Sequence, residues 1–211
     1  AAGTGWVPAA RAEGSGFTVV REDGFPVAPG VYHREMALEG GGHIDAVNMM
    51  EIDPANPVIR LAVTSPKGKV VALDTVRNQA KLIDGEGYRV VGAFNMDFYN
   101  TDPAFAGIPT GLQMTDCELI TAPLSTRSAL AIMPDGSFTI KKSIAFSGTV
   151  AVADSGASRS LTGVNRARTG GSPANHFILY TDKFSDTTRS VGDGVEVVLA
   201  PAEPGDRLKP D

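Results

Sequence analysis

Residues 89–100 carry an apolar run into a polar tip whose side chains could do chemistry. They read Arg-Val-Val-Gly-Ala-Phe-Asn-Met-Asp-Phe-Tyr-Asn. Side chains alternate between the two faces of a strand, so Asn95, Asp97 and Tyr99 would share one face. A carboxylate beside an amide at a strand end suits a catalytic or binding site. The same two residues also cap strand ends by satisfying backbone groups, and that plainer interpretation stays open.

Two elements would have to position this tip. The apolar residues of the stretch predict a strand over residues 90–97. The best helix candidate, residues 75–82, precedes it, with Asp74 or Thr75 as its cap and Asp84-Gly85 at its end. A helix that feeds a strand with polar residues at its end is a common way to build a site on a rigid element.

The rest of the chain alternates short apolar runs with turn residues, including 24 Gly and 14 Pro. Two hairpins are predicted, one across the glycines of residues 39–42 and one across Pro134-Asp135-Gly136. The predicted strands cover residues 31–37, 43–53, 58–63, 112–115, 118–121, 128–133, 137–141, 144–153, 158–161, 177–181 and 194–200. This pattern predicts an α+β fold that is mostly β, with short antiparallel strands and hairpins and one or two helices packed on a mixed sheet.

Three segments differ in composition. Residues 1–29 are rich in Gly, Ala and Pro with a strand-like pattern only at 17–20, which predicts a flexible N-terminal leader. Residues 30–200 form the predicted domain. Residues 201–211 are polar and contain proline, as expected of a polar tail or a processing end.

Composition argues against several classes of function. The 211 residues are 42% hydrophobic and 20% charged with a net charge of -5, values of an ordinary globular protein. The sequence has no cluster of Lys and Arg interleaved with aromatic residues, so it does not predict a nucleic-acid partner. No apolar run is long enough for a membrane helix. The small residues Ala1-Ala2-Gly3 are compatible with a mature N-terminus after signal cleavage.

The sequence favours no metal centre. His33, His43, His176 and the acid-flanked Cys117 stand apart from one another, without zinc-ligand spacing. Cys117 is interpreted as structural. The side-chain oxygens of Asp97, Asn100 and Asp102 could alternatively bind calcium, although the full set of acidic ligands is missing.

Arginine side chains are candidates for binding phosphate. Arg127 precedes a predicted strand, and Arg166 lies in a polar turn beside Asn165. A guanidinium group suits phosphate because it offers a planar fork of donors. The alternative for each is an ordinary solvated arginine.

The order of several motifs resembles the phosphodiester glycosidase family over roughly residues 30–200. The motifs are Val-Gly-Ala-Phe-Asn-Met-Asp-Phe-Tyr at 91–99, Gly-Ile-Pro-Thr-Gly-Leu at 107–112, Arg-Ser-Ala-Leu-Ala-Ile-Met-Pro-Asp-Gly at 127–136, Val-Asn-Arg at 164–166, Phe-Ile-Leu-Tyr-Thr at 177–181 and Gly-Val-Glu-Val-Val at 194–198. Each motif is short, so the specific signal is their order.

The resemblance implies hydrolysis of a sugar-1-phosphodiester by a secreted or bacterial cell-surface glycosidase that needs no cofactor. By position, Asp97 and Asn95 would be catalytic, with Asp97 as the carboxylate near the anomeric carbon or its attacking water. The residues implied in substrate binding are Tyr99, Arg127, Asn165 and Arg166. Stabilising the leaving phosphate and activating the attacking oxygen is the chemistry that such a bond requires.

The sequence departs from the family pattern in two places. Met96 stands where the family has a glycine between Asn and Asp, and the family's second half, with an Asn-x-Asp-Gly-Gly-Gly-Ser signature, is not in this sequence. Proteolytic processing would explain the second departure, with the C-terminal chain of the same precursor as a partner. Two other hypotheses remain: a carbohydrate-binding or interaction module without catalysis, and a hydrolase of another glycan linkage.

Overall fold

The computed structural model describes residues 16–85, 87–167, 175–190 and 194–208. The chain divides into two compact units, Ala1–Ile59 and Arg60–Asp211. The predicted domain of residues 30–200 runs across this division, and its boundaries stay a prediction. The predicted mostly β fold is confirmed, since the described residues form short antiparallel hairpins and one short helix.

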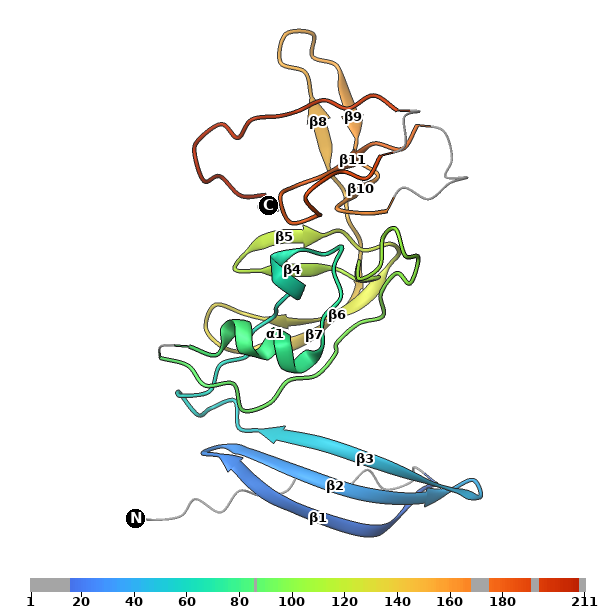
Figure 1. Cartoon of the computed structure of the whole chain (residues 1–211), viewed down its shortest axis with the longest axis vertical. Helices are drawn as coiled ribbons and strands as arrows, with labels where there is room; N and C mark the ends of the chain where they lie inside the picture. The colour runs from blue at the N-terminus through green and yellow to red at the C-terminus, as the bar shows by residue number, and fades with distance from the viewer. Residues whose placement is uncertain (1–15, 86, 168–174, 191–193, 209–211) are drawn as a thin grey trace. The chain divides into compact units, whose positions relative to one another are not determined.

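The first unit is an antiparallel sheet of β1 (Thr18–Ala28), β2 (Val31–Gly40) and β3 (His43–Ile52), which lie side by side in Figure 1. The hairpin predicted across the glycines joins β2 to β3, with Gly41 and Gly42 both at positive φ. A tight turn of this kind favours glycine, which has no Cβ to clash there. On one face Arg34 of β2 forms ion pairs with Glu22 of β1 and Glu51 of β3, which links all three strands.

The predicted leader is wrong for residues 18–28, which form the eleven-residue strand β1. Its Gly24 and Pro26 weaken the strand pattern, but β1 lies at the edge of the sheet, where a proline without an N–H group is tolerated. The register shifts between Pro26 and Ala28, next to that proline. Residues 1–15 of the predicted leader lie outside the described residues.

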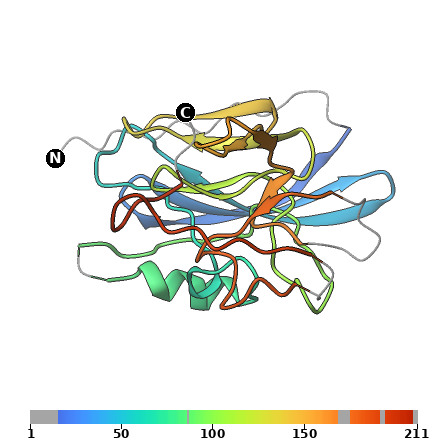
Figure 2. The same ribbon diagram turned by 90° about the horizontal axis from the view of Figure 1, so that it is seen from above.

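The second unit contains the predicted helix, α1 (Val76–Ile83), and a short 3-10 turn, η1 (Pro66–Gly68). Thr75 caps α1 as predicted, because its hydroxyl accepts the N–H of Asn78 at 3.2 Å. The helix ends at Asp84, also as predicted. It has no buried residue, and Figure 2 shows it at the margin of the unit. Among the described residues, no helix is long and apolar enough to cross a membrane.

The strands that the structure describes in this unit are short and occur in pairs. Three are antiparallel hairpins: β4 (Gln113–Thr115) with β5 (Glu118–Thr121), β6 (Arg127–Ile132) with β7 (Phe138–Ile144), and β8 (Thr149–Ala151) with β9 (Ser158–Ser160). The turn between β6 and β7 is the predicted Pro-Asp-Gly. The pair β10 (Gly163–Val164) and β11 (Ile178–Leu179) is parallel. In the described part of the chain these pairs form separate small sheets, and the expected mixed sheet does not form.

Two apolar clusters hold the second unit together. The larger contains Val70, Val71, Phe105, Ile108, Ile120 and Phe184. The smaller contains Leu119, Ala122 and Val164, and Leu208 of the predicted tail packs against it. The C=O group of Leu208 also accepts the N–H of Leu119 at 2.8 Å. Residues 209–211 of that tail lie outside the described residues.

The close approach of two loops brings the larger cluster together. Gly107, at φ 105°, lies so near residue 72 that a Cβ atom would be 2.0 Å from the carbonyl oxygen of Ala72. Only glycine avoids this clash and also adopts that φ without strain. Phe105 and Ile108, on either side of Gly107, can therefore pack against Val70 and Val71.

Three predicted strands do not form. They are residues 58–63, 90–97 and 194–200. Strand pairing needs backbone groups on a neighbouring segment as well as a suitable side-chain pattern. These segments have no paired neighbour among the described residues, and their apolar residues stay in contact with solvent. Val58, Phe94 and Val198 are 76%, 65% and 96% exposed. The corresponding strands at residues 144–153 and 177–181 are shorter than predicted, at Thr149–Ala151 and Ile178–Leu179.

Candidate functional site

Asp97 lies in a bend of the second unit, and its exposed carboxylate is fixed at both oxygens. Its Oδ1 accepts the N–H of Phe98 at 2.8 Å and the hydroxyl of Thr110 at 3.0 Å. Its Oδ2 accepts the N–H of Gly111. Because hydrogen bonds to an ionised carboxylate are stronger than neutral ones, this set favours one orientation of the side chain.

Residues 109–111, Pro-Thr-Gly, form a short piece of main chain that we call the strap. The N–H of Thr110 donates to the C=O of Phe98 at 2.9 Å, and the N–H of Asn100 donates to the C=O of Ile108 at 2.8 Å. These bonds close the loop that leads from Asp97 back to the strap. Gly111 is buried, and a Cβ atom there would lie 2.7 Å from Oδ2 of Asp97. A larger residue would displace the carboxylate.

Arg166 holds the strap from its carbonyl side. Its Nη1 donates to the C=O of Pro109, and its Nη2 donates to the C=O of Gly111 at 2.7 Å. A longer contact of 3.4 Å joins Nη2 to the C=O of Thr110. The residue is 4% exposed, and its Nε is buried without a hydrogen-bond partner among the described residues. The predicted phosphate-binding guanidinium is thus occupied by main-chain oxygens.

The electrostatics at Arg166 combine two opposing effects. Burial lowers the pKa of the guanidinium to about 10, while the negative charge of Asp97 acts to raise it. Arg166 therefore stays positively charged at neutral pH, behind the carboxylate that it helps to hold through the strap.

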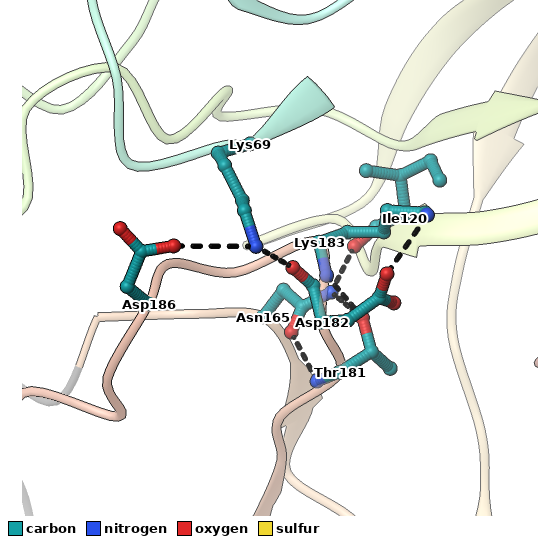
Figure 3. Close-up of polar contacts among 7 residues, drawn as sticks. All are labelled: Lys69, Ile120, Asn165, Thr181, Asp182, Lys183 and Asp186. Carbon is teal, nitrogen blue, oxygen red and sulfur yellow. Dashed lines mark hydrogen bonds and ion pairs between the residues drawn. The ribbon is translucent and has the colours of Figure 1, made fainter. Parts of the chain in front are cut away.

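Asn165 fixes the position of Arg166. It is fully buried at φ 50°, in the left-handed region that asparagine tolerates better than most residues. Figure 3 shows its side chain between Ile120 and Thr181. Its Nδ2 donates to the C=O of Ile120 at 2.7 Å and to Oγ1 of Thr181 at 2.8 Å, and its Oδ1 accepts the N–H of Thr181 at 2.8 Å. The predicted pocket-shaping residue therefore acts as an internal connection between three segments.

A set of polar contacts fixes the segment after Thr181, also drawn in Figure 3. The Nζ of Lys69 donates to the C=O of Asp182 at 2.6 Å and lies 3.5 Å from the carboxylate of Asp186. Lys183 pairs with the carboxylate of Asp182 at 3.0 Å. The two ammonium groups face two carboxylates, so this cluster has no surplus positive charge for a phosphate.

The other predicted site residues differ in how closely they join this arrangement. Tyr99 forms an isolated bridge with Pro109 of the strap and is 50% exposed. Asn95 is exposed, and no hydrogen bond joins it to another described residue. Arg127 begins β6 with an exposed side chain, and within the described ranges nothing pairs with its guanidinium. The N–H of Leu124, just before β6, donates to the C=O of Thr110 at 3.1 Å.

The oxygens considered for calcium bind backbone groups of their own loop. Asn100 accepts the N–H of Asp102 at 2.8 Å, and Asp102 accepts the N–H of Ala104 at 2.9 Å. In the part of the chain that the structure describes, no three His, Cys, Asp or Glu side chains come together in a way that could hold a metal ion. Cys117 is exposed in the turn between β4 and β5, so the thiol is not packed into a core.

Thr110 and Gly111 are the site residues that the sequence interpretation missed. Both lie in the Pro-Thr-Gly motif, where glycine reads as a turn residue and threonine as a loop residue. Their role depends on a carboxylate 13 or 14 positions earlier in the chain. Only the closed loop brings the two together, so local spacing held no signal for this contact.

Comparison with known proteins finds no matching family model, curated protein or solved structure. The resemblance to the phosphodiester glycosidases thus rests on the order of short motifs, and the function that it implies stays a prediction.

Proposed function

We propose that this protein is a glycoside hydrolase that acts on a sugar-1-phosphodiester. One observation carries the proposal: an exposed carboxylate, Asp97, is held at both oxygens beside a buried cation, Arg166. A carboxylate in a fixed orientation can act on the anomeric carbon or on its attacking water without first being ordered. The chemistry therefore needs no rearrangement of this side chain.

The phosphodiester is favoured over an ordinary glycoside because of its leaving group. Most glycosidases use two carboxyl groups, one of which protonates the leaving oxygen. A phosphate monoester departs as a stable anion and needs no such proton. In the reaction, the bond between C1 and the phosphate oxygen breaks with its electron pair on the phosphate. The oxygen of water bonds to C1 and loses a proton to Asp97. One carboxylate is sufficient for this reaction.

The phosphate would be bound by Arg127 in this proposal. The guanidinium of Arg166 is committed to the strap, whereas Arg127 is exposed and has no partner among the described side chains. The hydrogen bond from Leu124 to Thr110 ties the segment before β6 to the strap, which supports a shared site. Asn95 and Tyr99 would contact the sugar.

The test is release of free sugar from a synthetic sugar-1-phosphodiester by the wild-type chain and by Asp97→Asn. We expect at least a hundredfold loss of kcat in the variant, as for removal of one essential group. Asp102→Asn is the matched control, because Asp102 is an exposed carboxylate of the same loop that also accepts a backbone N–H. Full activity in Asp97→Asn would refute the role of this carboxylate. No release by the wild type would refute the proposed reaction.

A carbohydrate-binding module without catalysis is the second candidate, and the exposed rings around Asp97 favour it. Phe94, Phe98 and Tyr99 are 65%, 79% and 50% exposed, and aromatic faces beside amide and carboxylate groups are suited to sugar rings. This alternative predicts saturable binding of a glycan by titration calorimetry and no turnover of it. A secreted or cell-surface location and a C-terminal partner chain of the same precursor belong to the same set of proposals.

A further inference from the structure

The strap is held by two charged side chains that bind different polar groups of it. Arg166 donates to its C=O groups, and Asp97 accepts from Gly111 N–H and from the hydroxyl of Thr110. The strap therefore transmits the position of a buried residue to an exposed one. Arg166 and Asp97 are connected through Gly111, whose C=O accepts from Arg166 and whose N–H donates to Asp97.

The lone pairs of the Asp97 carboxylate are used unequally. An ionised carboxylate offers about four lone-pair sites, two on each oxygen. Among the described residues, Oδ1 accepts both Phe98 N–H and the Thr110 hydroxyl, whereas Oδ2 accepts only Gly111 N–H. One acceptor position therefore remains, and it is on Oδ2.

We propose that Thr110 and Gly111 are positioning residues that leave Oδ2 of Asp97 as the reacting oxygen, with Arg166 holding the strap in place. The inference rests on the proposed function, since it specifies which atom of Asp97 reacts. Thr110 fills the second site on Oδ1, and Gly111 orients Oδ2 while leaving room for it. The hydroxyl of Thr110 also lies 2.9 Å from the C=O of Phe98. It has one proton to donate, and the ionised carboxylate is the stronger acceptor.

The experiment compares Thr110→Val with Thr110→Ser in the full chain, with sugar release from the sugar-1-phosphodiester as the readout. Valine keeps the shape of threonine and removes the hydroxyl, while serine keeps the hydroxyl. We expect Thr110→Val to lose roughly ten- to a hundredfold in kcat with KM unchanged, the effect of one hydrogen bond to a charged group. Thr110→Ser is expected to retain most of the wild-type kcat.

Two further variants separate positioning from other effects. Thr149→Val makes the same change at an exposed position of β8 and should leave kcat unaltered. Arg166→Lys keeps a positive charge and loses the fork that binds two carbonyl groups. If the fork holds the strap, this variant also loses kcat. If charge alone matters, it keeps wild-type kcat, and the role of the strap is refuted.

The outcomes distinguish this inference from the proposed function. If the wild type turns over substrate and Thr110→Val has the same kcat, the inference is overturned and the proposed function stands. A rise in KM alone also overturns it, because the hydroxyl would then bind substrate. Absence of turnover in the wild type removes the function and the inference with it.

Discussion

Replacing the buried Asn165 with alanine should destabilise the second unit much more than replacing an exposed asparagine. Asn165→Ala removes three hydrogen bonds and leaves the C=O of Ile120 and the N–H of Thr181 without their partner. A buried polar group without a partner costs about 1–3 kcal/mol, so these two cost roughly 2–6 kcal/mol. Alanine at a left-handed φ adds about 1 kcal/mol.

Asn175→Ala is the matched control. Asn175 is also left-handed, at φ 78°, but it is exposed, and its contact with Arg159 uses its main-chain oxygen. This variant should therefore show only the backbone effect of about 1 kcal/mol. The difference between the two variants, roughly 2–6 kcal/mol, isolates the buried hydrogen bonds of Asn165.

Urea unfolding followed by circular dichroism measures this difference. With a slope of about 2 kcal/mol per molar, the midpoint for Asn165→Ala should lie about 1–3 M below that for Asn175→Ala. Hydrogen exchange of peptides from residues 60–167 assigns the loss to the second unit. Equal midpoints for the two variants would refute the view that Asn165 connects three segments inside the unit, and would favour the predicted role of shaping a pocket.

Two further predictions concern the loop at Gly107 and the start of α1. Gly107→Ala should cost about 3 kcal/mol or more, because its Cβ would lie 2.0 Å from the C=O of Ala72. Gly136→Ala, at φ 82° with open space around it, should cost only about 1 kcal/mol, and thermal unfolding of the two variants compares them directly. Donation from the Asn78 side chain and from Thr75 N–H lowers the pKa of Asp74. A lowered folded-state pKa gives stability that is present above the ordinary value of about 4 and is lost as the pH falls through the folded value. Amide protection in α1 should therefore decline below about pH 4, and protection that does not change with pH in the wild type would contradict this contribution.

The elements that the sequence predicted correctly are those that local chemistry determines. Thr75 caps α1, and Pro-Asp-Gly and the glycines after residue 39 close hairpins whose strands are neighbours in the chain. In each case the information lies within a few residues of the element. Such signals are reliable because no distant partner is required.

The failures have the opposite cause. Residues 90–97 have the composition of a strand, but a strand forms only where another segment supplies hydrogen-bond partners. Strand β1 shows the reverse, since pairing with β2 orders a segment that contains Gly24 and Pro26. The site shows the same dependence on distant segments. Asp97 was predicted from its residue type, whereas its contacts with Thr110 and Gly111 depend on how the loop closes.

The grip of Arg166 on the strap has a consequence for how this site can change over evolutionary time. Within the described ranges, the guanidinium of Arg166 donates to carbonyl oxygens, and such contacts do not depend on the side chains that those peptide groups carry. The carboxylate on the other side is demanding, because it needs a hydroxyl at Thr110 and the absence of a side chain at Gly111. The contact with Arg166 therefore places no demand on the side chain at position 109, while positions 110 and 111 should vary only together with the aspartate that they hold.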